Sequence, residues 1–435
     1  MSVLNNFTVS IAKGLRRLRK KELCDTIPDR RQHDSKDQRL MMEKCLIVSK
    51  VTRYEYEKHS HDNISDSELE KILRKRGSDY DAMITNHREQ KAFEENVAKS
   101  FKNMGLKVEM ASRLTYNEEL INWCDVVVPC GGDGTFLLAA SRVRDANKPV
   151  IGFNSAPHKS VGRLCLPTWC SNDVKGALHA LKEGRFRWMR RSRIRTTITS
   201  EPKLLDTITP VDLHTLHYCR YPPVSNQEDG QDTNERCTDG QTDETSSSLA
   251  TKVLPFLALN EVFIGESVTS RVSLLRLKID NGKWTHTKSS GLCVTTGTGS
   301  TSWHYSINCL RTHSVLELMK ILQDEYNISL DTSLEKAREV TEKYNQKLMF
   351  PPDSEQLAYS VREYITFEEW PTPRGLRVRD RAETVCVRSH CTDAGLVIDG
   401  SVSFPFNDGT QAHLEIHPED SLMTVCMDDT LPYST

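Results

Sequence analysis

Asp133 is the residue of this chain best placed to do chemistry, because it lies in a glycine-rich turn between two apolar runs. Residues 126–128 are β-branched valines, as a buried strand prefers, and residues 136–140 suit the start of a helix. A strand–turn–helix passage through Gly131-Gly132-Asp133-Gly134-Thr135 would place backbone N–H groups at a helix N-terminus, where phosphate binds. A carboxylate at a phosphate site would repel the ligand, so we expect it to have a chemical function, such as accepting a proton or holding a metal. The alternative is a tight connection whose glycines only permit positive φ.

Two more polar clusters follow apolar runs in the second half of the chain. Residues 295–303 hold glycines, hydroxyl groups and Trp303, and this composition suits a nucleotide or phosphate loop, although a plain polar loop between strands would look similar. Asn260 and Glu261 interrupt the apolar run 257–264, where polar side chains are costly unless they are paired. They are therefore either paired core groups or ligand-binding residues.

Two other features have a simpler structural explanation. Asp399-Gly400 is fully explained as a hairpin turn. A cationic stretch is expected to form a solvated strand face for the most part, with phosphate binding as the alternative. Its members are Arg185, Arg187, Arg190, Arg191, Arg193 and Arg195.

Composition limits the classes of function. The 435 residues predict two domains, and a net charge of -2 gives no basic excess to indicate nucleic-acid binding. No run approaches the roughly 20 apolar residues of a membrane span. The 13 cysteines are scattered and lack zinc spacing, so we expect reduced core thiols and no metal site made of protein side chains.

The N-terminus has a charge pattern of its own. Residues 1–21 contain no Asp or Glu, and Phe7, Ile11, Leu15 and Leu18 recur at helical spacing among basic residues. This pattern is typical of a mitochondrial transit peptide, and it also fits an ordinary solvated basic helix. We expect residues 1–40 to comprise a transit peptide and a flexible N-terminus.

The remaining chain divides into an α/β part and a β-rich part. Strand-like and helix-like runs alternate over 41–187, which predicts a Rossmann-like parallel sheet with helices on both faces. Residues 188–435 predict a β-sandwich-like domain whose last segment could pack back on the α/β domain. Two insertions interrupt it: 222–248, which is polar and predicted to be disordered, and 314–347, which predicts a helical pair.

Four motifs together resemble the NAD kinase family. The Gly131–Thr135 motif also occurs in diacylglycerol and sphingosine kinases, so it does not choose the substrate. The Asn260-Glu261 pair, the segment Thr298–Trp303 and the Asp399-Gly400 turn match NAD kinases in order and spacing, with closest likeness to the animal mitochondrial branch. Two departures are a Trp at 303 where the family has Tyr, and a longer segment from Gly152 to Leu166.

The resemblance implies transfer of the ATP γ-phosphoryl group to the adenosine ribose 2′-hydroxyl of NAD, with Mg²⁺ entering with ATP. Phosphate would be bound by Gly131, Gly132, Gly134 and Thr135, and Asp133 would accept the proton. The NAD and nucleotide sites would comprise Asn154, Asn260, Glu261, Thr296, Thr298, Gly299, Ser300, Thr301, Ser302, Trp303 and Asp399.

The resemblance also implies a homodimer in the mitochondrial matrix, or in the cytosol if residues 1–21 are not a transit peptide. No nucleic-acid or membrane partner is expected. The alternatives are a lipid kinase of the same superfamily and a non-catalytic nucleotide-binding regulator. The sequence does not separate NAD from NADH, or ATP from another phosphoryl donor.

Overall fold

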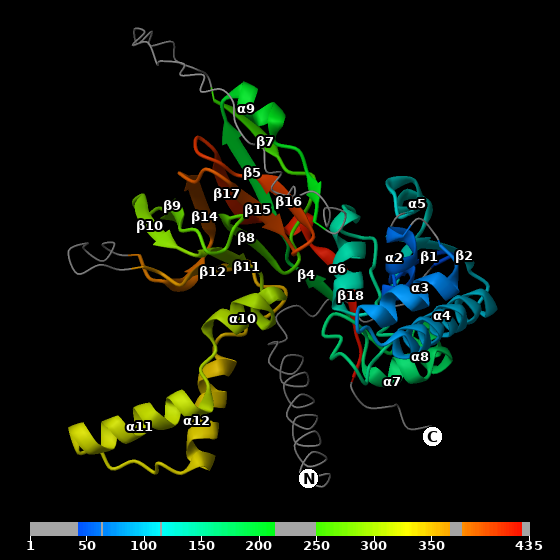
Figure 1. Ribbon diagram of the computed structural model, residues 1–435, viewed down its shortest axis with the longest axis horizontal. Coiled ribbons are helices and arrows are strands. Elements are labelled where there is room, and N and C mark those ends of the chain that lie inside the picture. Colours follow the sequence, from blue (N-terminus) through cyan, green and yellow to red (C-terminus); the bar gives the residue numbers. More distant parts are fainter. Residues whose placement is uncertain (1–41, 62–63, 114, 214–248, 366–375, 429–435) are drawn as a thin grey trace.

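The computed structural model describes residues 42–61, 64–113, 115–213, 249–365 and 376–428. It has two domains and a projecting helical hairpin, which confirms the predicted fold class (Figure 1). The transit-peptide prediction for 1–21 and the disorder prediction for 222–248 fall outside the described residues. Among the described residues, no helix has the length and apolar character needed to cross a membrane.

The α/β domain is built on a parallel three-stranded sheet in the order β2-β1-β3. Residues 150–153 extend it beside β3 through parallel bridges, and Val150 in turn bridges Thr424. The C-terminal strand β18 and its antiparallel partner β4 therefore lie in the domain that begins the chain. The strands are β1 (Lys44–Ser49), β2 (Lys107–Ser112), β3 (Val126–Cys130), β4 (Arg187–Arg191) and β18 (Leu422–Cys426).

Seven helices of the described residues lie around this sheet. Several of them begin after a side-chain N-cap: Thr52 and Ser65 form capping boxes at the start of α2 and α3, and the Asp79 side chain accepts the Ala82 N–H at the start of α4. Buried apolar residues of α4 and α8 cover one face of the sheet, and those of α5 and α6 cover the other. The helices are α2 (Arg53–Ser60), α3 (Asp66–Lys75), α4 (Tyr80–Asn103), α5 (Glu118–Trp123), α6 (Asp133–Arg142), α7 (Thr168–Asn172) and α8 (Val174–Lys182).

The second domain is a sandwich of two sheets, with strand orders β10-β9-β14-β17-β5-β7 and β13-β12-β11-β8-β15-β16-β6. Alternate residues of both sheets form one apolar core. The strands are β5 (Ile194–Ser200), β6 (Val211–Asp212), β7 (Ala250–Val253), β8 (Glu261–Glu266), β9 (Ser273–Ile279), β10 (Thr285–Ser289), β11 (Gly291–Thr295), β12 (Leu357–Arg362), β13 (Arg379–Ala382), β14 (Thr384–Ser389), β15 (Ala394–Ile398), β16 (Val402–Pro405) and β17 (Gln411–Ile416).

Short helices complete this domain, and the predicted helical pair projects from it as a hairpin (Figure 1). Its two helices pack on each other through Val315, Met319 and Ala337. The helices are α9 (Pro202–Thr207), η1 (Gly299–Thr301), α10 (Trp303–Asn308), α11 (Thr312–Tyr326), α12 (Leu334–Gln346) and η2 (Pro418–Asp420).

Two strand predictions need correction. The run 186–199 is not one strand, because it breaks at residues 192–193 as the chain passes from β4 in one domain to β5 in the other. The run 254–264 becomes a strand only at Glu261, because Pro255 has no N–H for a ladder and the N–H groups of residues 259–261 bond the Asp399 carboxylate.

Arg193, at the crossing between the domains, is fully buried rather than solvated as the cationic stretch suggested. Its Nη1 donates to the carbonyl oxygens of Ala140 and Val143 at the C-terminal end of α6, and its Nε donates to the Asp420 carbonyl oxygen at 2.5 Å. A cation is favoured at that end of a helix. Arg193 thus fastens the helix that begins at Asp133 to the start of the β-rich domain.

We expect Arg193→Met to lower the free energy of unfolding by about 3 kcal/mol, because buried carbonyl oxygens would lose their donor. Urea unfolding followed by tryptophan fluorescence measures the change. Arg195→Gln is the matched control two residues away, since Arg195 is partly exposed and pairs with Glu419 and Asp420, and it should cost about 1 kcal/mol or less. Equal losses in the two variants would contradict the role of Arg193.

Candidate functional site

The turn before α6 is compact because its first glycine has no side chain. A Cβ on Gly131 would lie 2.3 Å from Thr135 Oγ1 and 3.1 Å from Lys50 Cβ. Gly132 is the N-cap residue, and α6 begins at Asp133. Open space surrounds Gly134, and the predicted strand, turn and helix follow one another without a break. A phosphate group can therefore approach the N-terminal N–H groups of α6.

The Asp133 carboxylate is oriented by backbone donors that the sequence did not reveal. The N–H groups of Arg163 and Leu164 donate to its two oxygens at 3.1 and 2.8 Å. Each oxygen keeps a further lone pair, and the side chain is only partly buried. Asp133 is thus an aimed carboxylate that can accept one more hydrogen bond.

Asn154 shapes the loop that supplies those donors. Its Nδ2 donates to the Ser160 carbonyl oxygen at 3.1 Å, and its Oδ1 accepts the Ala156 N–H at 3.1 Å. Gly162 has a φ of 58°, and a Cβ there would lie 2.5 Å from Asn154 Nδ2. Asn154 is predicted to bind the cofactor, and in the structure its buried amide folds the loop behind Asp133.

Asp399 likewise forms hydrogen bonds inside the fold, next to the Asn260-Glu261 pair. Its carboxylate accepts the N–H groups of Leu259, Asn260 and Glu261 at 2.8 to 3.1 Å. Asp399 and Gly400 have φ values of 47° and 65°, which confirms the predicted turn between β15 and β16. The carboxylate therefore fixes the backbone before β8.

The loop from Thr295 to Trp303 packs directly on Asn260. The Thr296 hydroxyl donates to the Leu259 carbonyl oxygen at 2.6 Å and accepts the Gly299 N–H at 3.1 Å. A Cβ on Gly299 would lie 2.1 Å from the Asn260 carbonyl oxygen, so this close approach requires glycine. The Asn260-Glu261 pair and the Thr295–Trp303 loop therefore form one structural unit.

Several hydroxyl groups of this loop form hydrogen bonds within the protein. The Ser300 hydroxyl donates to the Gly297 carbonyl oxygen at 2.6 Å and accepts the Phe350 N–H at 3.2 Å. Thr298 Oγ1 accepts from Arg191 Nη1 at 3.2 Å, which ties the loop to β4. Thr301, Ser302 and Trp303 are partly buried or exposed at the end of the loop.

The Glu261 side chain is buried with one oxygen, Oε2, that has no hydrogen-bond partner among the described residues. Burial, and secondly the nearby Asp399 carboxylate, raise the pKa of Glu261 to about 8. The backbone N–H of Trp303 donates a hydrogen bond to the Glu261 carboxyl group and opposes that rise. Burial also raises the pKa of Asp399 to about 6, against the effect of its three N–H donors and Arg193. At neutral pH Glu261 is therefore the neutral acid of the pair and can donate as well as accept.

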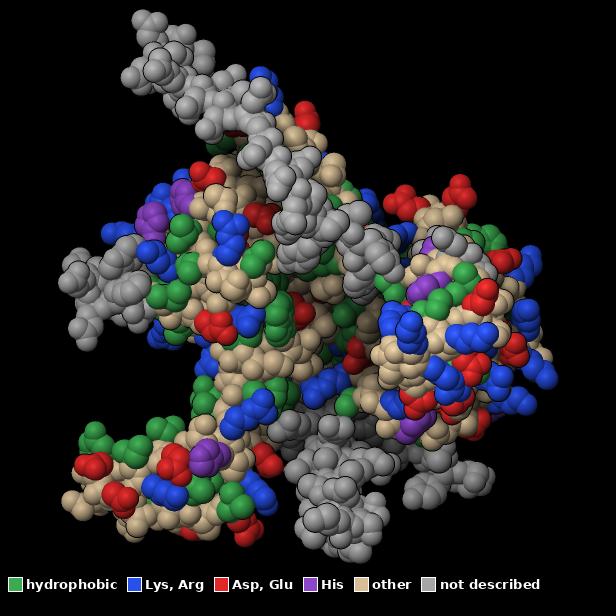
Figure 2. All heavy atoms as spheres, viewed as in Figure 1, with side chains coloured by type: hydrophobic (Ala, Val, Ile, Leu, Met, Phe, Trp, Pro, Cys, Tyr) green, Lys and Arg blue, Asp and Glu red, His purple; other side chains and the backbone are tan. Residues whose placement is uncertain are grey.

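Packing joins the two halves of the site. Leu259, just before Asn260, lies in the same apolar cluster as Phe136 of α6 and Leu164 of the loop that holds Asp133. The space-filling view has a hollow between the two domains on the face shown (Figure 2). Asp133 thus lies on one wall of a junction whose other wall carries Asn260 and Glu261.

Comparisons with known proteins identify the family of this chain. A family model described as the ATP-NAD kinase N-terminal domain matches residues 29–186. NAD kinase 2, mitochondrial, of Homo sapiens is 38% identical over 387 residues, which cover 88% of this chain and 84% of that protein. The chain belongs to the NAD kinase family. The Rattus norvegicus protein of the same name is 37% identical and covers 88% of each chain.

Two solved structures also align with this NAD kinase family member over most of its length. The Archaeoglobus fulgidus NAD kinase in complex with ATP has a TM-score of 0.43 at 15% identity, covering 88% of this chain and 94% of its own. The yeast NADH kinase complexed with NADH has a TM-score of 0.42 at 12% identity, covering 92% and 89%.

We expect Glu261→Gln to change how the stability of this NAD kinase depends on pH. Glu261 is neutral in both states below its unfolded pKa of 4.5, and between 4.5 and about 8 only the unfolded chain releases the proton. The free energy of unfolding of the wild type should therefore fall across this range relative to the variant.

Urea unfolding at several pH values measures this difference, with Glu335→Gln on the exposed side of α12 as the control. Parallel pH curves for wild type and Glu261→Gln would contradict a neutral Glu261.

Proposed function

We propose that this chain transfers the γ-phosphoryl group of ATP to the 2′-hydroxyl of the adenosine ribose of NAD, which gives NADP and ADP. The observation that carries the proposal is the aimed carboxylate of Asp133 at the N-terminus of α6, opposite Asn260 and Glu261. Family membership supports the same reaction. No feature of the described residues favours a lipid acceptor.

In this proposal Asp133 orients the 2′-hydroxyl group and receives its proton as the oxygen attacks the γ-phosphorus. The bond between the γ-phosphorus and the β,γ-bridging oxygen breaks, and ADP leaves. Transfer of this kind depends on position and charge more than on covalent help. The N–H groups of Arg163 and Leu164 keep the carboxylate in place, and the N-terminus of α6 favours the phosphate groups.

NAD recognition is assigned to the groups that the fold leaves available. The Asn260 side chain makes no hydrogen bond within the described part of the chain, and neutral Glu261 can donate from its buried carboxyl group. Both would bond the adenosine part of NAD. Trp303 is 38% exposed and packs at 4.5 Å between ring centroids on Phe263, so one face of its ring can cover the nucleoside.

Mg²⁺ is assigned to the ATP substrate. Within the described residues no group of three or more His, Cys, Asp or Glu side chains could hold a metal ion. The ion would therefore enter on the phosphate oxygens, as is usual for Mg²⁺ in phosphoryl transfer.

We expect Asp133→Asn to lower kcat by about 10²- to 10⁴-fold, because the proton acceptor is lost. NAD affinity should stay within about threefold of the wild type, since Asn260 and Glu261 are unchanged. NADP formation from ATP and NAD, with NADH as a second acceptor, measures the rate, and calorimetry measures NAD affinity. Asp206→Asn, at an exposed position of α9, is the control. Full activity of Asp133→Asn would remove this residue from the mechanism.

We infer that the chain forms a homodimer through the projecting hairpin. Leu318, Ile321, Leu322 and Tyr326 of α11 are between 40% and 69% exposed, and hydrophobic side chains follow one edge of the hairpin (Figure 2). A contiguous exposed apolar surface of this kind marks an interaction site. A second copy would cover it across a two-fold axis.

The double substitution Leu318→Ser with Ile321→Ser should shift the protein from dimer to monomer, because it removes apolar area from that surface. Light scattering after size exclusion gives the mass. Asp324→Ser on the same helix should leave the dimer intact. A wild type that is monomeric at all concentrations, or a double variant that stays dimeric, would contradict this interface.

We propose that the chain works in the mitochondrial matrix. Four of the relatives that it matches carry the name NAD kinase 2, mitochondrial, and residues 1–21 have the basic, acid-free pattern of a transit peptide. Residues 1–41 fused to a fluorescent protein should bring that protein to mitochondria. A purely cytosolic signal would contradict the proposal.

A further inference from the structure

A separate basic pocket lies between the end of α12, the short helix α10 and the edge strand β13. It has a volume of about 380 Å³. None of its lining residues belongs to the Gly131–Thr135 turn or the Asn260-Glu261 pair. It is lined by His304, Tyr344, Lys347, Leu348, Ala358, Arg377, Arg379, Asp380 and Arg381.

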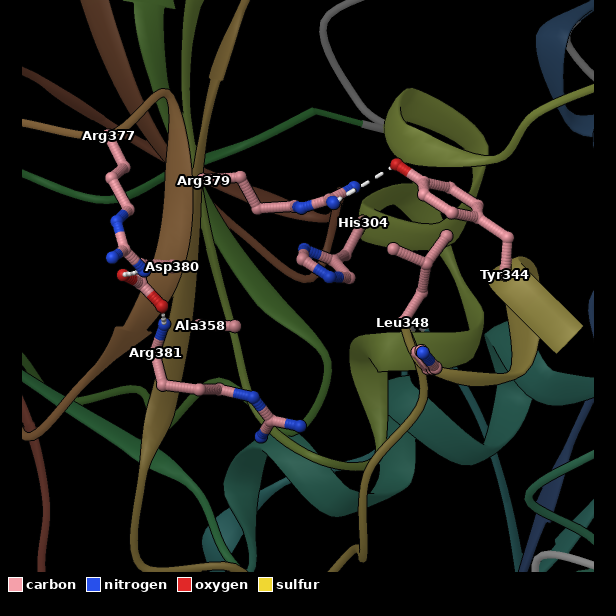
Figure 3. A pocket seen from close by; sticks show the side chains of 9 residues that line it. His304, Tyr344, Leu348, Ala358, Arg377, Arg379, Asp380 and Arg381 are labelled. Atoms are coloured by element: carbon pink, nitrogen blue, oxygen red, sulfur yellow. Dashed lines mark hydrogen bonds and ion pairs between the residues drawn. The ribbon is translucent and has the colours of Figure 1, made fainter. Parts of the chain in front are cut away.

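Arg379 and Arg381 give the pocket its charge. They alternate along β13 opposite Ser360 and Ala358 of β12, so both point to one side of the sheet. Figure 3 shows both extending from β13 to the side on which His304 and Leu348 lie, with Arg379 directed toward Tyr344, whereas Arg377 and Asp380 meet each other on the other side of the strand. The single lining carboxylate is therefore already paired, and the small residue Ala358 lies opposite Arg381.

No direct ion pair neutralises these cations within the described part of the chain, and the Asp380 charge acts on Arg381 only from a distance. Neither Arg379 nor Arg381 nor Lys347 forms an ion pair there; Arg379 Nη2 donates to the Tyr344 hydroxyl at 3.1 Å. The Arg381 guanidinium stacks 3.2 Å from the centre of the Phe350 ring. Burial lowers the pKa of Arg381 to about 10, and burial, with Arg379 and Arg381, lowers that of His304 to about 4. The pocket therefore carries a net positive charge.

Its chemistry fits a phosphate ester. Guanidinium forks match phosphate oxygens in pairs, and an exposed lysine adds a point charge at the rim. Tyr344, Leu348 and Ala358 give an apolar and aromatic wall that free inorganic phosphate would not use. The volume lies within the usual range of about 300–1,000 Å³ for small-molecule sites.

We propose that this pocket binds a phosphate ester of nucleotide size, and that binding changes the affinity for NAD. Two contacts connect the pocket to the Thr295–Trp303 loop. Phe350, beneath Arg381, donates its N–H to Ser300 Oγ, and His304 follows Trp303 directly. A phosphate that draws Arg381 from Phe350 would act on this loop. The effect on NAD rests on the proposed function, whereas the binding itself does not.

Calorimetric titration of the full-length chain tests the site without turnover. Tripolyphosphate probes the phosphate chemistry alone, and ADP adds a nucleoside for the apolar wall. Each probe should bind the wild type at two sites, the phosphate-binding turn at Gly131–Thr135 and this pocket. Arg379→Gln and Lys347→Gln should each weaken only the binding at the pocket, by about tenfold, as loss of one charge-assisted hydrogen bond implies. Lys347 is exposed, so its variant should fold normally. In Arg338→Gln, at an exposed position of α12, and in Asp133→Asn, binding at the pocket should be the same as in the wild type.

NAD titrations with and without saturating tripolyphosphate, in the absence of ATP and Mg²⁺, test the connection. The NAD affinity should change at least threefold in the wild type and not in Arg379→Gln. Equal probe affinity in all variants, or probe binding that is lost in Asp133→Asn, would overturn the pocket. Binding without any change in NAD affinity would overturn the connection. Absence of NADP formation would contradict the proposed function and leave the binding result standing.

Discussion

The hydrogen bonds from Arg193 to the C-terminal carbonyl oxygens of α6 are the interaction on which the site depends most. The helix carries Asp133 at its other end, so its position and tilt set the place of the carboxylate. The guanidinium is fully buried and comes from the residue that begins the β-rich domain. Its charge also attracts Asp399, which holds the backbone of Asn260 and Glu261. One buried cation therefore connects both walls of the site.

The two carboxyl groups of the β-rich wall divide their roles by environment. Asp399 has three backbone donors and the nearby Arg193, which favour its charged form, and it serves as a fixed acceptor inside the fold. Burial and the nearby Asp399 charge both oppose ionisation of Glu261, so Glu261 keeps its proton. Neutral Glu261 beside the Asn260 amide is suited to recognising a nucleoside, because it offers both a hydrogen-bond donor and an acceptor without adding charge near the phosphate groups.

Local patterns predicted the turns that carry the candidate site residues, and long-range contacts determine how these residues are held. The strand, turn and helix around Asp133 depend on neighbouring residues, as does the Asp399-Gly400 turn, so the sequence indicated both. The partners of Asp399 lie about 140 positions earlier, and the donors to Asp133 lie 30 and 31 positions later. Composition and spacing carry no information on such contacts. For the same reason the arginine stretch suggested a solvated face, whereas Arg193 is buried against a helix 50 positions away.

The central claim is that Asp133 and the Asn260-Glu261 pair act on one NAD molecule. A crystal structure of the protein with NAD and a non-hydrolysable ATP analogue tests it directly. The account predicts the adenosine 2′-hydroxyl about 2.6–3.2 Å from an Asp133 oxygen, with Asn260 and Glu261 bonded to the same nucleoside. An NAD molecule bound at Asn260 and Glu261 with its 2′-hydroxyl turned away from Asp133, beyond the reach of one bridging water, would contradict it.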